Sequence, residues 1–395
     1  MKALGLNWTI GSNFGWGTYG LELALHLFRR GTPTPVLLQE PAQLATDELQ
    51  SARLDLVLRL SRDALAGTGP VSLSAPGNGL VVAHAIGNNG ERAFAAETVP
   101  YRAEREVALA FVENTVCSSA GRQRYASYPL TVAGSRWCGE VLRQLGAPAV
   151  VDCIQGIDPA TFHPAPRRGD FSRRFVVFSG GKLEFRKGQD LVLAAFGAFR
   201  SRHPEALLLA VWGNQWTRST GLGHFRHSVH VSGPPARLDG GGVDWKHWLG
   251  SAGISRDDVL MIPQVAHDRL GVLMREADVA LFPNRAEGGT NLVAMEAMAC
   301  GVPTILSANT GHLDIVAEGA CIPLRRQRPV VVDDRYLGTG GWGESDVEEM
   351  VEALETVWRD RERARAIGAA GAEFMGRFTW GSQIERLLGL LDGTA

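Results

Sequence analysis

Two glycine-rich segments in the second half of the chain carry charged residues at spacings that suit a phosphorylated ligand. The first is Gly180–Gly188, GGKLEFRKG, which follows the apolar run Val176–Ser179. We predict that this run is a strand and that the segment is a loop at its carboxyl end, where open α/β sheets bind ligands. Lys182 and Lys187 would then neutralise a diphosphate. The alternative is a solvated loop that only happens to be basic.

The second segment is Asn284–Pro303, NRAEGGTNLVAMEAMACGVP, which follows another apolar run and opens a predicted helix. Its glycines let an anion approach the unpaired backbone N–H groups at the start of that helix, where the helix dipole also favours negative charge. Glu287 can accept hydrogen bonds from sugar hydroxyls, and Glu296, further along the helix, from a ribose diol. The alternative is an ordinary helix start with two solvated glutamates.

The first half contains a competing motif. Gly15-Trp16-Gly17-Thr18-Tyr19-Gly20 matches G-x-G-x-x-G, and Glu40 follows at the end of the next β-type run. This is the pattern of a dinucleotide-binding loop, which would make the protein an NAD-dependent oxidoreductase. However, the first glycine of that motif normally ends the strand, whereas six residues, 9–14, intervene here.

Histidines supply two further candidate sites. His84 ends a predicted strand and is followed by a tight-turn cluster that includes Asn88 and Asn89. We expect either an active-site histidine or a structural one whose hydrogen bonds are satisfied. The series His224, His227 and His230 has a spacing that drifts around a helix, so we interpret it as a loop cluster and not as a metal site.

The elements that must position these residues alternate between strand and helix. Such alternation predicts parallel sheets covered on both faces, the doubly wound α/β architecture. Predicted helices include 21–30 after the glycine-rich loop and an amphipathic tail at 378–391. The predicted strands are Ala3–Trp8, Val36–Gln39, Leu80–His84, Val176–Ser179, Leu207–Val211, Val259–Ile262, Val279–Phe282 and Thr304–Leu306.

A proline-rich stretch, Asp158–Asp170, is the best candidate for a linker. We therefore expect one α/β domain over residues 1–160, a second over 161–377, and a final helix over 378–395. The segment 212–248 is long for a connection and rich in Gly, Trp and His, including Trp216, which is typical of functional loops.

Composition narrows the class of protein. The 395 residues include 40 Lys and Arg against 42 Asp and Glu, a net charge of −2, so the chain lacks the basic character of a nucleic-acid binder. Its five cysteines are scattered, and no apolar run is long enough to span a bilayer. The apolar start, residues 1–8, is too short for a secretory signal. We expect a cytoplasmic protein without a disulfide framework.

Taken together, the segments resemble the donor-binding half of the retaining glycosyltransferases of family four, which have the GT-B fold. That family has a basic pair spaced five positions apart, matched by Lys182 and Lys187, with Lys182 where Arg is usual. It also has two glutamates at an EAMACG-like helix, matched by Glu287 and Glu296. Their spacing is nine positions instead of eight, because Gly-Gly-Thr-Asn replaces a three-residue turn. Residues 133–158 and 378–380 extend the resemblance over nearly the whole chain.

The resemblance implies two Rossmann-like domains facing across a cleft, with the last helix crossing back to the first domain. It implies catalytic roles for His84, Lys182, Lys187 and Glu287, and weaker acceptor contacts from Trp16, Tyr19, Asn88 and Asn89. The donor-binding residues that it implies are Gly15, Gly17, Gly181, Lys182, Lys187, Glu287, Gly288, Gly289, Thr290, Asn291, Leu292 and Glu296.

We therefore expect a retaining glycosyltransferase that moves a hexose from a UDP- or GDP-linked sugar to a hydroxyl acceptor, with small molecules as its only predicted partners. No Asp-x-Asp occurs in the sequence, so we expect no metal and no cofactor. Besides the oxidoreductase, a regulatory protein that binds sugar nucleotides without turnover stays open. The base, the sugar, the acceptor, the oligomeric state and any peripheral membrane association are also open.

Overall fold

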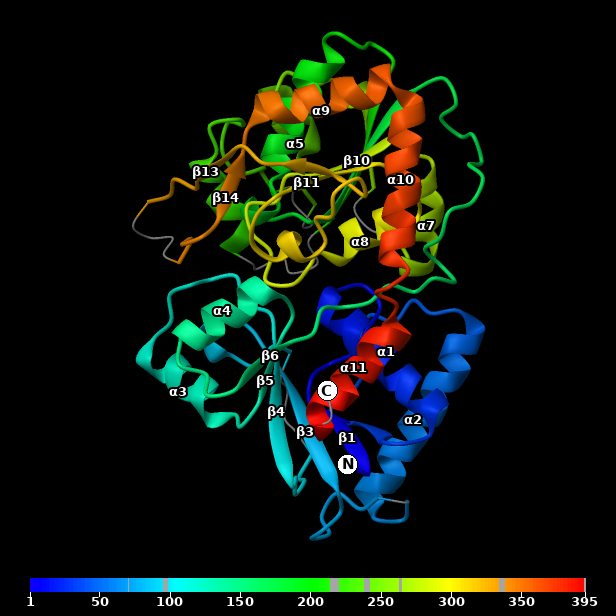
Figure 1. Cartoon of the computed structure of the whole chain (residues 1–395), viewed down its shortest axis with the longest axis vertical. Helices are drawn as coiled ribbons and strands as arrows, with labels where there is room; N and C mark the ends of the chain where they lie inside the picture. Colours follow the sequence, from blue (N-terminus) through cyan, green and yellow to red (C-terminus); the bar gives the residue numbers. More distant parts are fainter. Residues whose placement is uncertain are drawn as a thin grey trace. The chain divides into compact units, whose positions relative to one another are not determined.

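The computed structural model describes residues 1–69, 71–94, 99–213, 220–237, 242–262, 265–333 and 338–393, and Trp216 lies outside these ranges. The chain divides into two compact units (Figure 1). Unit 1 comprises Met1–Gly156, Ala266–Asp268 and Phe378–Ala395, and unit 2 comprises Ile157–Val265 and Arg269–Arg377.

Unit 1 is built on a six-stranded parallel sheet with the strand order β2-β1-β3-β4-β5-β6. Apolar runs form its central strands, and β1 and β3 are buried along their whole length. The strands are β1 Ala3–Leu6, β2 Thr34–Leu37, β3 Leu80–Ile86, β4 Arg105–Ala110, β5 Thr131–Ala133 and β6 Val150–Asp152. The helices are α1 Gly15–Arg30, α2 Glu48–Ala66, α3 Ser119–Ser127, α4 Arg136–Gln144 and α11 Trp380–Asp392, with the short 3₁₀ segment η1 Asn88–Gly90.

Helix α1 begins at Gly15, six residues before the predicted start, so the glycine-rich segment is the first part of a helix and not a loop. Two of its glycines are required by close packing. A Cβ on Gly17 would lie 2.8 Å from the backbone N and O of Gly11, and one on Gly20 would lie 2.8 Å from Nε1 of Trp8. The G-x-G-x-x-G pattern therefore has a packing explanation that needs no dinucleotide.

The last helix, α11, packs on α1 within unit 1 (Figure 1). The rings of Trp380 and Tyr19 stack with their centroids 5.6 Å apart. Glu385 accepts hydrogen bonds from His26 at 2.8 Å and from Nε of Arg30 at 3.0 Å. Thr379 caps the helix through its side chain. The C-terminal helix is thus part of the same body as the N-terminal strand.

Unit 2 has its own six-stranded parallel sheet with the strand order β12-β11-β10-β7-β8-β9, and a separate antiparallel pair, β13 and β14. Its strands are β7 Phe175–Lys182, β8 Ala206–Gly213, β9 Val259–Met261, β10 Val279–Phe282, β11 Thr304–Ser307, β12 Ile322–Leu324, β13 Gln327–Pro329 and β14 Gly343–Ser345. Its helices are α5 Gln189–Arg200, α6 Trp245–Ser251, α7 His267–Arg275, α8 Leu292–Ala299, α9 Val347–Arg359 and α10 Arg361–Met375. Four 3₁₀ segments are η2 Phe185–Lys187, η3 Thr220–His227, η4 Arg256–Asp258 and η5 Thr310–Asp314.

The strand order of unit 2 reverses between β7 and β10. After β7 the chain adds β8 and β9 on one side, and β10, β11 and β12 then continue on the other side. Such a reversal leaves a crevice at the carboxyl ends of the two central strands, the usual ligand position in this architecture. The segments that follow these strands are the two motifs singled out from the sequence. In the described ranges, no helix combines the length and the apolar character that crossing a membrane requires.

Candidate functional site

The two charged loops of unit 2 lie side by side at the point where the strand order reverses. Strands β7 and β10 are paired directly, with Val177 opposite Val279. The loops approach so closely that a Cβ on Gly188 would lie 2.4 Å from the carbonyl oxygen of Pro283. Gly188 also has φ +72°, a conformation that favours glycine. Local backbone geometry therefore brings the Lys187 loop against the Glu287 loop.

Lys187 and Glu287 form an ion pair between these loops, with Nζ 2.5 Å from Oε1. Both side chains are largely buried, and Glu287 is 4% exposed. Arg186 donates to the other carboxylate oxygen of Glu287 at 3.1 Å, and Asn284 donates to Oε1. Burial raises the pKa of Glu287, but Lys187 and Arg186 outweigh it and lower the pKa to about 2. Burial lowers the pKa of Lys187 below its ordinary value, although Glu287 opposes this shift.

The charges continue to Lys182, which is the last residue of β7 and not part of the loop as predicted. Its Nζ lies 2.6 Å from Oε1 of Glu184, whose other oxygen accepts from Nε of Arg186 at 2.9 Å. Burial raises the pKa of Glu184, yet Arg186 and Lys182 lower it below its ordinary value. Three cations and two carboxylates thus alternate through the site and leave one positive charge in excess. Sequence reasoning had missed Glu184, which links Lys182 to the rest of this network.

The second loop places residues 287–291 at the start of helix α8. Asn291, with φ +64°, precedes the helix, and its carbonyl oxygen accepts from the N–H groups of Ala294 and Met295. Leu292 is the first residue of the helix, and N–H groups at this position have no intrahelical acceptors. Gly288, Gly289 and Thr290 are buried, and Thr290 donates to the sulfur of Met295 at 3.0 Å. The loop therefore presents a helix N-terminus beside the Lys187–Glu287 pair.

His312 supports this loop from the neighbouring segment η5. Its Nδ1 donates to the carbonyl oxygen of Ser307 at 3.2 Å, so its Nε2 accepts from the amide of Asn291 at 3.1 Å. Burial lowers its pKa to about 4, although Glu287 opposes that shift. The histidine is thus neutral and fixed in one tautomer. No short motif marks it in the sequence.

Two further donor-site candidates occupy distinct positions in unit 2. Gly181 lies near the end of β7 with φ +130°, and a Cβ there would lie 4.0 Å from Cδ of Lys187. Glu296 lies in the middle of α8 and is 2% exposed. The structure therefore gathers the predicted residues of unit 2 on β7 and its loop, on the loop between β10 and α8, and on α8 itself, with Glu296 inside the helix.

In unit 1, His84 is fully buried in β3, which runs two residues beyond the predicted strand end. Its Nε2 lies 2.8 Å from Glu106 on β4, and its Nδ1 lies 3.4 Å from the amide of Asn7. Burial and, to a smaller extent, the positive charge of the nearby Arg92 lower its pKa to about 4. With both ring nitrogens engaged and no exposed surface, His84 has the surroundings of the structural histidine that the sequence left as an alternative.

Asn88 and Asn89 build the loop that follows β3. The side-chain carbonyl oxygen of Asn88 accepts from the N–H groups of Glu113 and Asn114, both at 2.9 Å. The corresponding oxygen of Asn89 accepts from the N–H and hydroxyl of Ser118. These hydrogen bonds tie the segments around residues 88 and 113–118 together, which is a local structural role.

The aromatic candidates of α1 belong to a ring cluster. Trp16 contacts Phe111 with centroids 4.5 Å apart and Tyr19 with centroids 6.3 Å apart. Tyr19 is 5% exposed and stacks on Trp380, whereas Trp16 is half-buried. Tyr19 therefore fills the packing between α1 and α11, and Trp16 retains a surface. Gly15 and Gly17 lie in the first turn of α1, where backbone N–H groups also lack intrahelical partners.

The described part of the chain contains no group of three or more His, Cys, Asp or Glu side chains arranged to hold a metal ion. The rings of His224 and His227 stack with centroids 6.2 Å apart. His230 approaches Glu344 instead, with Nε2 3.9 Å from the carboxylate. The three histidines thus do not converge on one point. The five cysteines are free thiols.

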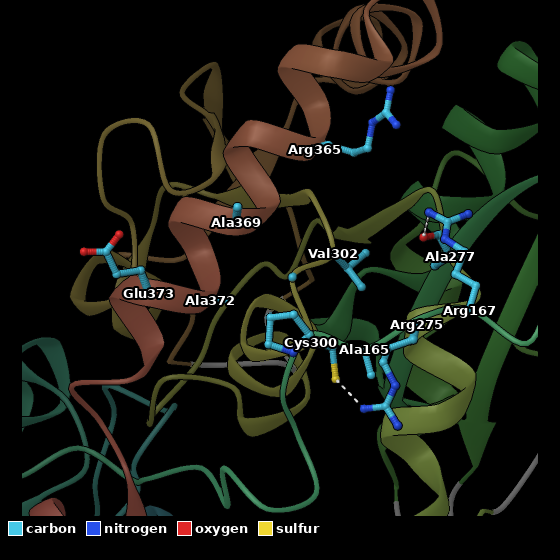
Figure 2. A pocket seen from close by; sticks show the side chains of 12 residues that line it. Ala165, Arg167, Arg275, Ala277, Cys300, Val302, Arg365, Ala369, Ala372 and Glu373 are labelled. Carbon is cyan, nitrogen blue, oxygen red and sulfur yellow. Dashed lines mark hydrogen bonds between the residues drawn. The ribbon is translucent and has the colours of Figure 1, made fainter.

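A pocket of about 530 Å³ lies at the opposite edge of the unit 2 sheet from the charged loops. Ala277 and Val302, which precede β10 and β11, are part of its wall, and Figure 2 shows Arg275 directed toward the sulfur of Cys300. Neither Lys187 nor Glu287 lines it. Its other lining residues are Pro164, Ala165, Arg167, Gly301, Arg365, Ala369, Ala372 and Glu373.

The chain is similar to known proteins in its family pattern, its sequence and its structure. The family described as Family 4 Glycosyltransferase in conflict systems matches residues 131–387, more than half of the chain. A GDP-mannose-dependent α-(1-6)-phosphatidylinositol monomannoside mannosyltransferase of Mycolicibacterium smegmatis is 28% identical over 257 residues, which is 60% of this chain and 55% of that protein. A D-inositol 3-phosphate glycosyltransferase of Kineococcus radiotolerans is 30% identical over 60% of this chain and 50% of that protein. The chain spans about half the length of the curated relatives it matches.

Solved structures match the whole chain at lower identity. A sucrose-phosphate synthase of Thermosynechococcus elongatus has a TM-score of 0.65 at 16% identity and covers 100% of this chain and 99% of its own. The Anabaena protein HepE, in complex with UDP-glucose, has a TM-score of 0.63 at 14% identity with 100% of both chains covered. These similarities show the GT-B fold with its two Rossmann-like units. By the family match over residues 131–387, the chain belongs to the family 4 glycosyltransferases.

Proposed function

We propose that this protein transfers a hexose from a nucleoside-diphosphate sugar to a hydroxyl acceptor, with retention of configuration and without a metal. The observation that carries the proposal is the Lys187–Glu287 pair, with Nζ 2.5 Å from Oε1, next to the first turn of α8. Cations and helix N–H groups bind a diphosphate, and a carboxylate binds sugar hydroxyls. The relatives named above for GDP-mannose and the UDP-glucose complex support this donor class.

In this proposal each unit has its own substrate. The predicted second domain, residues 161–377, binds the donor, with Lys182 and Lys187 on the diphosphate, Glu287 on the hexose and Glu296 on the ribose. The predicted first domain, residues 1–160, together with the helix at 378–395, binds the acceptor. The backbone groups of unit 2 assigned to the diphosphate are those of Gly181, Gly288, Gly289, Thr290, Asn291 and Leu292.

The transfer step exchanges one bond to the anomeric carbon for another. The bond from this carbon to the leaving phosphate oxygen breaks, and the acceptor oxygen forms a new bond on the same face of the sugar. The acceptor's proton passes to the leaving phosphate, so the products are the glycoside and a nucleoside diphosphate. Lys187 and Lys182 stabilise the charge that grows on this phosphate, and such electrostatic stabilisation is commonly the largest catalytic contribution.

Binding and turnover experiments separate this proposal from its alternatives. Thermal-shift titrations with UDP, GDP and NAD should give a shift with one nucleoside diphosphate and none with NAD. Hydrolysis of the matching sugar nucleotide, followed by NMR of the released sugar's anomer, should show retention. A shift with NAD alone would favour the oxidoreductase. Binding without hydrolysis or transfer across a broad acceptor panel would favour the regulatory protein.

A further inference from the structure

Arg285 is a fully buried arginine between the two donor loops, and no motif in the sequence marks it. It follows β10 by three residues and precedes Glu287 by two. Its guanidinium stacks on the ring of Phe185, with Cζ 3.9 Å from the ring centroid, and its Nη1 donates to the Phe185 carbonyl oxygen at 2.8 Å. Phe185 in turn precedes Lys187 by two residues. Arg285 is therefore attached to both loops. On one loop it lies two residues before Glu287, and on the other it contacts Phe185, which lies two residues before Lys187.

Two carboxylates hold the guanidinium in one orientation. Asp190, at the start of α5, receives two parallel hydrogen bonds, from Nη1 at 2.8 Å and from Nη2 at 2.7 Å. Glu344 on β14 accepts from Nε at 2.7 Å. Asp190 is fully buried as well. Burial raises the pKa of Glu344, but His230 and Arg285 outweigh it and lower the pKa to about 2. The planar guanidinium is thus held through Nε, Nη1 and Nη2, in a geometry that the ammonium group of a lysine does not reproduce.

Backbone hydrogen bonds extend this connection. The N–H of Arg285 donates to the carbonyl oxygen of Arg186 at 2.7 Å, and its own carbonyl oxygen accepts from the N–H of Gly343 at 3.0 Å. Asp190 also accepts from the hydroxyl of Ser228 at 2.6 Å, which joins the long segment after β8 to the same centre. The segments of Phe185 and Asp190 and of Glu344 therefore meet at Arg285, and the segment of Ser228 is joined to it through Asp190.

A buried ion pair is a poor means of stabilising a fold, because apolar residues of similar volume are often as stabilising. Its rigid geometry is a better explanation for an arginine at this position. We propose that Arg285 is a positioning residue that holds the side chains of Lys187 and Glu287 in the relative positions that the donor requires. This inference rests on the proposed function, since it concerns the same site. Arg285 itself touches neither reacting group, and it acts through the two loops.

The principal test is Arg285→Lys, which retains the charge but removes the fork. Displacement of catalytic groups by about 1 Å costs roughly 100-fold in rate, so we expect the donor kcat/KM to fall by about that factor. The matched control is Arg200→Lys on the same unit. Arg200 donates to Asp258 at 2.7 Å and is partly buried, but it contacts neither donor loop. We expect this control to lose a similar amount of thermal stability and less than about 3-fold in kcat/KM.

A second measurement distinguishes positioning from general destabilisation. In the Glu287→Gln background the ion pair is already lost, so its positioning no longer matters. Arg285→Lys should therefore lower kcat/KM by less than about 3-fold there. Ser228→Ala, which removes one neutral hydrogen bond from Asp190, should show an intermediate loss and covers the case in which Arg285→Lys does not fold.

Equal losses in the wild-type and Glu287→Gln backgrounds would overturn the inference. So would an Arg285→Lys protein that keeps wild-type kcat/KM, or a Ser228→Ala protein whose kcat/KM is unchanged when Arg285→Lys does not fold. The proposed function fails in a different way, since the wild-type protein would then neither bind UDP or GDP nor release a sugar from their conjugates.

Discussion

Lys187 Nζ lies 2.5 Å from Glu287 Oε1, in a buried contact between two loops that are 100 residues apart in the sequence. Each group is the ionic partner of the other. A diphosphate that binds here must share the lysine with the carboxylate, and a hexose hydroxyl must share the carboxylate with the lysine. Removal of one partner should therefore destabilise unit 2. In the proposed function the pair also takes part in donor recognition.

Single and double substitutions of this pair should separate the two contributions. Glu287→Gln leaves the buried Lys187 without its partner, which costs about 3–5 kcal/mol in the free energy of unfolding. Lys187→Met should cost less, because Arg186 still pairs with Glu287. The double variant leaves neither charge, so its stability should recover to within about 2 kcal/mol of wild type. Denaturant unfolding of all three variants measures this. Additive losses in the double variant would contradict the buried ion pair.

Transfer activity should behave in the opposite way. Lys187→Met removes the cation that stabilises the leaving phosphate, so kcat/KM should fall by roughly 100- to 1,000-fold, and the double variant should not recover it. Lys246→Met, on an exposed position of α6, is the control for loss of a positive charge and should stay within about 3-fold. A Lys187→Met protein with wild-type turnover would remove Lys187 from the mechanism.

Acid should destabilise unit 2 over a defined range. The pKa of Glu287 in the folded protein is about 2, below its unfolded value of about 4.3. A carboxyl group with a lowered pKa contributes stability that is present above the unfolded pKa and is lost as the pH falls through the folded one. The loss between about pH 4.3 and about pH 2 is of order 3 kcal/mol. Unfolding of Glu287→Gln over the same range should be less pH-dependent, and an unchanged dependence would contradict the lowered pKa.

The parallel sheets and both charged loops of unit 2 could be predicted because their signals are local. Val279–Phe282 is an apolar run between polar residues, and it forms β10 with the predicted bounds. Strand β4, Arg105–Ala110, was missed because it begins with two charged residues. The start of α1 was predicted too late, since glycines disfavour helices and their packing against Gly11 and Trp8 is visible only in the structure.

Arg285 shows why part of the site could not be predicted. In the sequence it stands in a polar loop, where arginine is usually solvated. Its burial depends on Asp190, 95 residues away, and on Glu344, 59 residues away. His312 depends in the same way on Asn291, 21 residues distant. No pattern of spacing within one segment encodes such contacts, because they arise only when the fold brings segments that are distant in the sequence together.

His84 gives a test of the structural interpretation in unit 1. Because it has no exposed surface and both nitrogens are engaged, we expect His84→Asn to lower the free energy of unfolding by about 1–3 kcal/mol and to change kcat by less than about 3-fold at saturating donor. Its pKa of about 4 lies below the unfolded value of about 6.5, so wild type should lose stability as the pH falls from about 6.5 to about 4. His84→Asn should lack this component. A collapse of kcat without loss of stability would instead return His84 to a catalytic role.

Two glycines of α1 form a matched pair for testing the packing explanation of the G-x-G-x-x-G segment. A Cβ at position 17 would lie 2.7 Å from the ring of Phe14 and 2.8 Å from the backbone of Gly11, whereas a Cβ at position 15 meets nothing within 4 Å. Gly17→Ala should therefore cost about 1–3 kcal/mol. Gly15→Ala should be neutral or stabilise the protein by up to about 1 kcal/mol. Equal effects of the two substitutions, measured by denaturant unfolding, would contradict this difference in packing.

Metal dependence tests how the site supplies positive charge. Lys182, Arg186 and Lys187 outnumber Glu184 and Glu287 by one charge, and the first turn of α8 adds its N–H groups. In the proposed function these groups hold the diphosphate in place of a divalent cation. Transfer should therefore proceed at an unchanged rate after dialysis against EDTA, and added magnesium should raise kcat by less than about 2-fold. In Lys182→Ala, magnesium should restore part of the lost activity, because the cation then substitutes for the missing ammonium group. Wild-type activity that disappears in chelator and returns with magnesium would show that these cations do not suffice.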